Sequence, residues 1–379
     1  MGCRTINRRF ASVLAVVLIG SACESRAVDQ SPTERASSGT PWVIENAQVN
    51  VDDGIRVLVL HDMEGLAGQD DPKTFDFDNE EYSLGQELLI GDVNAVVDGL
   101  FAGGATEVHV VDGHGSGNPD PDIPPDRLDE RAEQVVRDEW FDAYFDLAEP
   151  GAYDAVAVVA MHAKTGSGGF ASHTYTLGMD FILNGQSITE TELVALSWGR
   201  VGVPLIFASG DDRLARDLQA MTWIEYVTVK QATSANTAIL RPLAEARADL
   251  RAAAQRAAEN LGQAKVMRIS TPITATLRVV PPASLERMDG FPGVDYADNS
   301  VTFEAADLAA AYVGLGKIVG VATRGYMSVL GEVIEARPDG DAIRAEFSEA
   351  LMARWFDVES GRWQPEEESP PPPRKYYGF

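Results

Sequence analysis

The sequence predicts an α/β protein in which helices cover both faces of a mainly parallel sheet, a three-layer αβα fold, followed by a smaller α+β portion. Two observations lead to this fold class. Short apolar runs of strand length alternate with longer segments in which apolar residues recur at helical spacing, as in proteins with parallel sheets. From about Lys265 this alternation stops, and consecutive strand-like runs precede a helix.

The first strand is expected at 56–61, where apolar residues run into the sequence HDMEG. Further strands are expected at 106–111, 153–161, 203–209 and 226–230, and in the second portion at 266–273, 275–280 and 300–303. The dipeptide Asn184-Gly185, which follows another apolar run, marks a hairpin turn.

Helices are expected between these strands. The first carries apolar residues at helical spacing from Leu89 to Leu100 and ends at Gly103-Gly104. The others are an acidic amphipathic helix at about 126–147, a helix from Thr189 to about Trp198, an Ala- and Arg-rich helix from Pro242 to about Leu261, and a helix at 305–321.

The first 22 residues have the features of a signal peptide. Arg4, Arg8 and Arg9 precede an apolar stretch that is too short to cross a bilayer. Cys23 follows small residues and resembles the lipidated cysteine of a bacterial lipoprotein, whereas plain secretion and an uncleaved anchor are the alternatives. Because Glu24 is not the Asp associated with inner-membrane retention, we expect an exported, periplasmic protein anchored in the outer membrane at Cys23.

Composition divides the remaining chain into four ranges. Residues 23–50 are polar and predict a disordered tether. Residues 51–264 predict the larger α/β domain. Residues 265–360 predict the smaller α+β domain. The Pro-rich tail at 361–379 predicts disorder, and the alternative is an arm that docks on a neighbouring subunit through Tyr376, Tyr377 and Phe379.

Charge and cysteine content exclude several classes of partner. The net charge of −27 argues against binding to nucleic acid and against adsorption on anionic lipid, so contact with a membrane is expected only through an N-terminal lipid anchor. The two cysteines, Cys3 and Cys23, both lie in the leader region, so the folded body has no disulfide to stabilise it.

Side chains that can bind metal follow three successive strands. Asp62 and Glu64 follow the first strand, His114 the second and His162 the third. The carboxyl ends of parallel strands meet at one edge of a sheet, so these side chains are expected to converge. The two neighbouring acids would repel each other unless a cation lies between them. Carboxylates combined with imidazoles suit Zn²⁺ or a related ion, and a bridging carboxylate makes two ions feasible.

Two further residues are candidates for the same site. The pattern Thr189-x-x-Glu192 predicts a capping box, which assigns Glu192 to the helix start and leaves Glu190 as a candidate ligand. His173 lies in the Gly-rich segment GSGGFASHTYT and suits general acid/base catalysis, unless it is an incidental residue of a mobile loop. His61 and His109 are not expected at this site. Strand alternation points His61 away from Asp62, and His109 lies inside a strand, which favours a structural role.

These motifs together resemble those of the zinc D-aminopeptidases of the dipeptide-transport-operon type, peptidase family M55. The family's S-x-D-x-E-G is LHDMEG here, with Leu60 in place of Ser, and its D-S-H is DGH, which ends at His114. Its strand-end histidine is His162, and its S-H eleven residues later is Ser172-His173. The tripeptides GDD at 210–212 and VKQ at 229–231 are also similar to motifs of the family. The resemblance covers residues from about 57 to 324.

The resemblance implies two zinc ions per chain, with Asp62 as the bridging ligand and His173 as the catalytic histidine. The implied ligands are Asp62, Glu64, His114, His162 and Glu190. It also implies a ring-like homo-oligomer. Asp211, Asp212 and Lys230 are candidates for binding substrate, and the alternative is a structural role as a turn acid pair and a strand-end lysine.

The function that these inferences favour is an aminopeptidase that removes the N-terminal residue from short peptides, of the D-alanine type. One alternative is another two-metal hydrolase that acts on phosphoesters or cyclic amides. The sequence shows no arginine cluster near the candidate ligands, which argues against a phosphate substrate. Another is a lipoprotein binding module stabilised by metal, although structural zinc prefers cysteine ligands.

Overall fold

The computed structural model describes residues 41–49, 54–362 and 374–378, and they belong to one compact unit that runs from Thr40 to Phe379. The predicted signal peptide, Cys23 and most of the predicted tether lie outside the described residues. Within the described part of the chain, no helix combines the length and the apolar character needed to cross a membrane.

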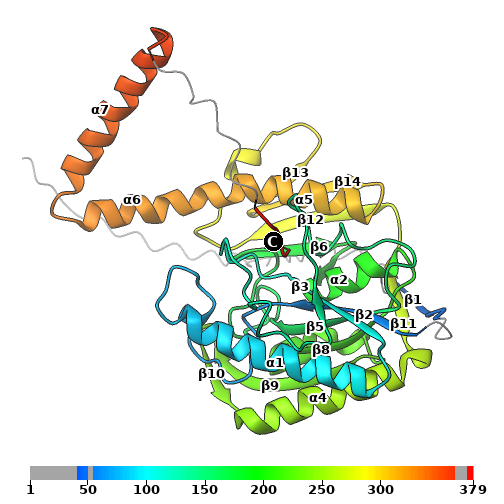
Figure 1. Ribbon diagram of the computed structural model, residues 1–379. Helices are drawn as coiled ribbons and strands as arrows, with labels where there is room; N and C mark the ends of the chain where they lie inside the picture. The colour runs from blue at the N-terminus through cyan, green and yellow to red at the C-terminus, as the bar shows by residue number, and fades with distance from the viewer. Residues whose placement is uncertain (1–40, 50–53, 363–373, 379) are drawn as a thin grey trace, which may run out of the picture. The chain divides into compact units, whose positions relative to one another are not determined.

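A seven-stranded sheet forms the centre of the fold, as Figure 1 shows. Neighbouring strands are parallel except at one edge, where β10 pairs antiparallel with β9, so the predicted α/β class is confirmed. In spatial order the strands are β10 (Thr237–Leu240), β9 (Glu225–Ser234), β8 (Leu205–Asp211), β5 (Ala155–Met161), β2 (Arg56–His61), β3 (Glu107–Asp112) and β4 (Glu133–Gln134).

Successive residues of β2 face opposite sides of this sheet and divide the interior into two cores. Val57 and Val59 pack in the core that contains α1 (Tyr82–Ala102) and α4 (Leu243–Glu259), two helices that lie together on one face (Figure 1). Leu58 and Leu60 pack in the other core, with α2 (Glu190–Gly199) and a second sheet. A short helix, α3 (Asp212–Asp217), follows β8.

The second sheet has five strands and joins parts of the chain that lie far apart in sequence. Its order is β13 (Asp295–Ala297), β14 (Ser300–Ala305), β12 (Ile273–Val279), β6 (Met179–Leu183) and β7 (Gln186–Ile188), and α5 (Leu308–Ala322) packs on it. β6 and β7 form the hairpin expected at Asn184-Gly185. They belong to the range predicted as the first domain, yet β6 pairs with β12 of the second.

Part of the range predicted as a tether is also paired. β1 (Trp42–Asn46) runs antiparallel to β11 (Lys265–Ile269), and Trp42 packs against the core. Residues 42–46 are therefore part of the folded protein, because they pair with β11 and Trp42 packs against the core.

The helix predicted at 126–147 is wrong, because this segment forms turns, with β4 as its regular element. The side chain of Asp142 accepts hydrogen bonds from the backbone N–H groups of Tyr144 and Phe145, which holds a turn in place of a helix. The apolar residues of the segment, including Phe141 and Leu147, nevertheless reach the core from this irregular path.

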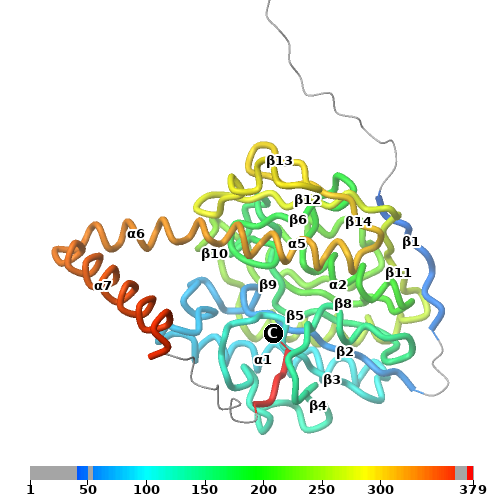
Figure 2. Tube along the Cα trace, turned by 90° about the horizontal axis from the view of Figure 1, so that it is seen from above, coloured from blue at the N-terminus to red at the C-terminus, as the bar shows by residue number. Residues whose placement is uncertain are grey.

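The last described residues, 374–378, lie along the edge of the central sheet. The N–H of Asp112 donates to the carbonyl of Tyr377 at 2.9 Å, and Arg137 and Tyr376 exchange two backbone hydrogen bonds. A side chain at Gly378 would meet the carbonyl oxygen of Asp112 at 1.8 Å, so only glycine fits there. Figure 2 shows this segment, in red, near β3 and β4. This part of the predicted disordered tail thus docks on its own chain.

Candidate metal centre

The turn after β2 brings two acids to the carboxyl edge of the sheet. Asp62 and Glu64 are buried, and both accept hydrogen bonds from the N–H of Met63, at 2.8 and 3.3 Å. A Cβ atom at Gly65 would lie 2.1 Å from the carbonyl oxygen of Met161, so glycine is required for the turn to rest against β5. The close approach explains why a glycine ends the HDMEG motif.

His114, two residues beyond β3, faces both acids. Its Nδ1 lies 3.1 Å from Oδ1 of Asp62 and 3.0 Å from Oε2 of Glu64. Its Nε2 lies 2.9 Å from the carbonyl oxygen of Phe75. Donation from Nε2–H to Phe75 leaves Nδ1 as the nitrogen directed at the carboxylates, which is the usual arrangement of a metal-binding histidine and its outer partner.

His162 reaches the same place through an irregularity in β5. The register of β5 against β8 shifts between Val158 and Met161, and Ala160 has a φ of 62°. Such a bulge changes the direction in which the following side chain points. The Nε2 of His162 thereby lies 3.4 Å from Oδ2 of Asp62 and 3.6 Å from Oε1 of Glu190.

Glu190 is the first residue of α2, and the predicted capping box is present beside it. Thr189 and Glu192 cap the helix through reciprocal hydrogen bonds, which leaves Glu190 available for the site. Oε1 of Glu190 accepts from the N–H of Tyr175 at 2.6 Å, and Oε2 accepts from the hydroxyl of Tyr144. Sequence reasoning missed both tyrosines, although the Gly-rich loop before Tyr175 marked this region.

All five predicted ligands come together in groups whose ligand atoms lie within 4.8 Å of one another. Asp62, Glu64 and His162 each belong to two groups. The groups are Asp62–Glu64–His114, Asp62–His162–Glu190 and Glu64–His162–His173.

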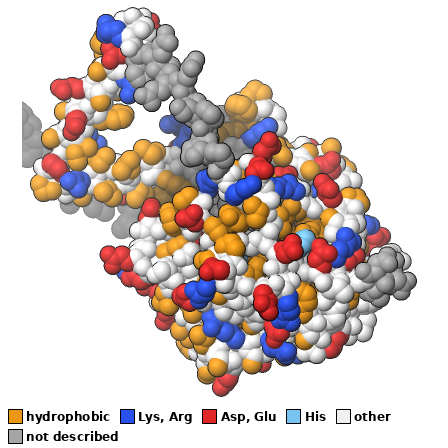
Figure 3. All heavy atoms as spheres, in the orientation of Figure 1, with side chains coloured by type: hydrophobic (Ala, Val, Ile, Leu, Met, Phe, Trp, Pro, Cys, Tyr) orange, Lys and Arg blue, Asp and Glu red, His pale blue; other side chains and the backbone are white. Residues whose placement is uncertain are grey.

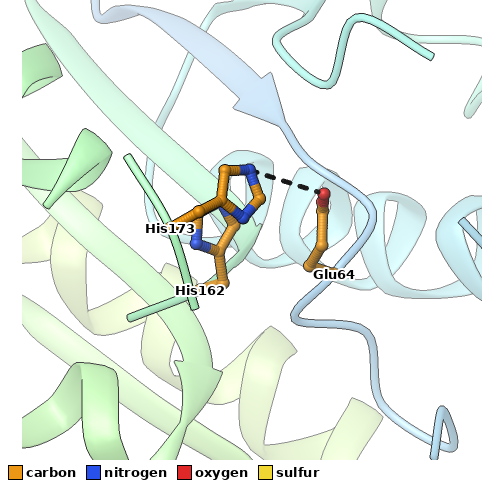
Figure 4. Close-up of side chains that lie close together, drawn as sticks. All are labelled: Glu64, His162 and His173. Carbon is orange, nitrogen blue, oxygen red and sulfur yellow. Dashed lines mark ion pairs between the residues drawn. The ribbon is translucent and has the colours of Figure 1, made fainter. Parts of the chain in front are cut away.

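His173 stacks on His162, with ring centroids 3.9 Å apart, as Figure 4 shows. Its Nδ1 lies 2.6 Å from the carbonyl oxygen of Ala171, so Nδ1 carries the proton and Nε2 has a free lone pair. Nε2 lies 4.0 Å from Glu64 and 3.9 Å from Glu190. Burial, followed by the influence of His162, lowers the pKa of His173 to about 4, so this ring is neutral near pH 7.

The electrostatics of the cluster fit a bound cation. Burial lowers the pKa of His162, but Glu190 and Asp62 outweigh burial and raise it to about 9. Burial opposes a similar shift in His114, whose pKa is raised well above its usual value by Glu64 and Asp62. Burial and then repulsion from Glu64 raise the pKa of Asp62. The carboxylates therefore attract positive charge strongly.

Unsatisfied atoms point to the same conclusion. Oδ2 of Asp62 and Nε2 of His162 face each other, and neither has a hydrogen-bond partner among the described residues. Buried polar atoms are rarely left without partners, and a carboxylate oxygen beside an imidazole nitrogen is a zinc-type donor pair. The residues present thus fit the implied metal.

The remaining histidines, His61 and His109, lie outside these groups. His109 contacts the hydroxyl of Tyr153 at 2.7 Å and Glu107 at 3.1 Å. His61 is buried, with Nδ1 3.8 Å from Asp112.

Asp211 and Asp212 make backbone contacts that match the structural alternative for them. Asp211 caps α3 and also accepts from the N–H of Phe170 at 2.8 Å. Asp212 accepts from the N–H of Ala232 at 2.9 Å and pairs with Arg216. Their role in binding substrate stays a prediction.

Lys230 is buried beneath the turn that carries Glu64. Its Nζ donates to the carbonyl oxygen of Glu64 at 2.6 Å and to the side chain of Gln69 at 2.7 Å, and it lies 3.9 Å from the ring centre of Phe170. Burial lowers its pKa to about 7. Lys230 therefore positions a ligand-bearing turn, and its contact with substrate stays a prediction.

The cluster lines a cavity of about 170 Å³. A larger cavity of about 650 Å³ shares Glu64, His114, His173 and Tyr175 with it. The walls of the larger cavity include apolar side chains such as Phe75 and Leu177. A small molecule with both polar and apolar parts can thus approach the ligands.

A buried carboxylate–histidine cluster at the carboxyl edge of a mainly parallel sheet is the arrangement expected of a metal-dependent α/β enzyme. Residues 55–315 match peptidase family M55, which is described as D-aminopeptidase, and the match covers more than half of the chain. The chain therefore belongs to this family, and the resemblance inferred from its motifs is confirmed.

A sequence comparison and a structure comparison both agree with this assignment. A D-aminopeptidase from Bacillus subtilis (strain 168) is 25% identical over 170 residues, which are 44% of this chain and 60% of that protein. The match therefore spans about three fifths of the relative's length. A solved structure of the Zn-dependent D-aminopeptidase DppA from Bacillus subtilis, described as a self-compartmentalizing protease, matches with a TM-score of 0.64 at 22% identity. It covers 71% of this chain and 98% of DppA, and supports the fold.

Proposed function

We propose that this protein is a zinc-dependent aminopeptidase that removes D-amino acids, of the D-alanine type, from the N-termini of short peptides. The observation that carries the proposal is the convergence of five candidate ligand side chains from four segments of the chain in one cluster. Membership of the M55 family and the description of the Bacillus subtilis relative support the same activity.

The ligand groups support two zinc ions per chain. One ion would be held by Glu64 and His114 and the other by His162 and Glu190, with Asp62 shared between them. When bound, such ions lower the pKa of a coordinated water and polarise a substrate carbonyl.

The residues of the chain supply the remaining groups of the reaction. The free Nε2 of His173 faces the acids, where it can accept a proton from the attacking water and return it to the leaving amine. The same atom, once protonated, can stabilise the developing oxyanion. A substrate's free amino terminus would meet Glu64 or Glu190, and this contact would favour cleavage of the first residue only.

The substrate class is tested with a pair of mirror-image dipeptides. We expect zinc-loaded protein to hydrolyse D-Ala-D-Ala faster than L-Ala-L-Ala, with Asp62→Ala protein from the same preparation as the background control. A clear preference for the L,L dipeptide would contradict D-specificity and leave the metallopeptidase in place. Metal binding without cleavage of either dipeptide would favour another two-metal hydrolase.

We also propose that the protein forms a ring-like homo-oligomer. The description of DppA as a self-compartmentalizing protease supports this proposal. An assembly that encloses its active sites admits short peptides more readily than folded proteins, which agrees with the proposed substrate.

The location is a proposal that rests on sequence features alone. A signal peptide that ends before Cys23 would export the chain, and a lipid on Cys23 would anchor it to the outer membrane, facing the periplasm. In fractionated cells, we expect wild-type protein with the membranes and Cys23→Ser protein in the soluble periplasmic fraction. Unchanged membrane association of the variant would rule out the lipid anchor.

A further inference from the structure

The C-terminal arm, residues 374–378, continues the central sheet at the point where β4 ends. β4 covers β3 only as far as Val110, whose carbonyl oxygen accepts from the N–H of Val135 at 2.9 Å. Two residues further along β3, the N–H of Asp112 donates to the carbonyl oxygen of Tyr377 in the arm, also at 2.9 Å. The arm thus takes the position of an edge strand beside the last residue of β3. It lies after residue 315, where the family match ends.

The bond between Asp112 and the arm satisfies a buried backbone group. Asp112 is buried, and the next N–H along the chain, that of Gly113, donates to the carbonyl oxygen of His61 in β2 at 2.8 Å. Successive N–H groups of a parallel strand point to opposite neighbours, so the N–H of Asp112 faces the edge that β4 leaves uncovered. Buried N–H groups are nearly always paired. Among the described residues, the arm supplies the backbone acceptor for this N–H.

Asp112 connects the arm to a candidate metal ligand. Its Oδ1 accepts from the N–H of His114 at 2.8 Å, within the turn that follows β3. The Nδ1 of His114 in turn lies 3.1 Å from Asp62 and 3.0 Å from Glu64. Two hydrogen bonds therefore lead from the backbone of the arm to the histidine that faces both acids.

The other edge of the arm is also paired. Tyr376 and Arg137 exchange two backbone hydrogen bonds, each of 2.9 Å, whereas the neighbouring Tyr377 bonds to Asp112. The side chain of Tyr376 packs against the core, and the guanidinium of Arg374 lies 5.1 Å from the centre of its ring. The arm is therefore held between two segments of the chain.

Gly378 allows the arm to approach β3 closely. Its φ is 149°, and a Cβ atom there would lie 1.8 Å from the carbonyl oxygen of Asp112. Lys375, by contrast, forms an exposed pair with Asp138. Acidic and basic side chains are intermingled on the face drawn in Figure 3, and exposed pairs contribute little. The backbone contacts and Gly378, rather than this pair, therefore determine where the arm docks.

We propose that the C-terminal arm is a positioning element of the metal centre, which holds the turn that carries His114 and thereby strengthens zinc binding by Glu64 and His114. The proposal rests on the proposed function, because it requires His114 to be a zinc ligand. His162 and Glu190 make no hydrogen bond with the arm among the described residues. One of the two proposed ions therefore depends on the arm, and the other does not.

Zinc titration of metal-free, full-length protein tests this proposal. Wild type should show two binding steps by calorimetry. In Gly378→Ala protein one step should weaken by about 10- to 100-fold, the range for loss of a group that orients a metal ligand, and the other should keep its affinity. Lys375→Ala is the matched control, because it removes an exposed contact and leaves the backbone bonds of the arm in place. It should bind both ions as wild type does.

A peptide added in trans distinguishes positioning from a general loss of stability. A synthetic peptide of residues 374–379, at about 1 mM to match the effective concentration of a tethered segment, should restore the weakened step in Gly378→Ala protein. The same peptide carrying Gly378→Ala should not restore it. Wild-type affinities in Gly378→Ala protein, equal weakening of both steps, or equal rescue by the two peptides would overturn the proposal.

Amide hydrogen exchange gives a second measurement, which needs no metal. In metal-free Gly378→Ala protein, the N–H groups of Asp112 and His114 should exchange faster than in wild type, whereas those of α2 should be unchanged. Faster exchange throughout the protein, or unchanged exchange at Asp112, would contradict the proposal. A wild type that binds no zinc would overturn the proposed function as well, whereas zinc binding that Gly378→Ala leaves intact would overturn this inference alone.

Discussion

Asp62→Ala should lose most of the bound metal and nearly all peptidase activity. Asp62 is the residue shared by the two ligand groups that contain His114 and Glu190, so its removal weakens both at once. Metal content per chain, measured by elemental analysis after desalting, checks the result. A variant that keeps the wild-type metal content would show that Asp62 is not the bridge.

A charge-neutral substitution separates the loss of metal from a loss of fold. Asp62→Asn keeps the size of the side chain and an oxygen for the N–H of Met63, but it removes the charge. Burial and Glu64 raise the pKa of Asp62, so the charged form is costly in metal-free protein, and metal-free Asp62→Asn should be at least as stable as metal-free wild type. Zinc should raise the Tm of wild type and not that of the variant.

His173→Ala should keep its metal and lose rate, by about 10²- to 10⁴-fold for a general acid/base. The free Nε2 of His173 lies near Glu64 and Glu190, but in the proposed site the five other side chains supply the ligands. Metal analysis and kcat are measured on the same sample. His109→Ala, which alters a histidine bonded to Tyr153 away from the cluster, is the matched control and should change neither quantity.

The opposite outcome has a clear structural meaning. Glu64, His162 and His173 form a third group with ligand atoms in reach of one another. If His173→Ala loses metal in proportion to its loss of rate, His173 is a ligand and the proton must move through another group.

The convergence of the candidate ligands could be predicted from sequence because the rule that governs it is geometric. Parallel strands end at one edge, so Asp62, His114 and His162 were expected together without knowledge of the loops. The capping box separated Glu190 from Glu192 because it depends on residues only three positions apart.

The positions that sequence reasoning missed depend on contacts between distant segments. Tyr144 donates to Glu190 from a segment whose composition favours a helix. The segment instead forms a turn, in which the side chain of Asp142 accepts from the N–H of Tyr144. The pairing of β6 with β12 joins residues that are 92 to 100 positions apart, from Ala275 with Leu183 to Val279 with Met179. The sequence of either strand alone does not indicate its partner. The sequence offered Tyr376 and Tyr377 as a docking arm, but its Pro-rich composition did not indicate that their backbone groups bond within the same chain.

The β6–β7 hairpin has a consequence for how this protein can be divided. His173 lies shortly before β6, and Glu190 follows β7. The two strands between them belong to the five-stranded sheet, whereas the side chains of His173 and Glu190 lie in the cluster at the edge of the seven-stranded sheet. A fragment that stopped at residue 264 would lack β12, and β6 would lose its long antiparallel partner. The part of the chain that carries the candidate metal centre is therefore not a transferable module. The second sheet holds His173 and Glu190 in position, so exchanging this sheet between relatives would also change the geometry of the candidate site.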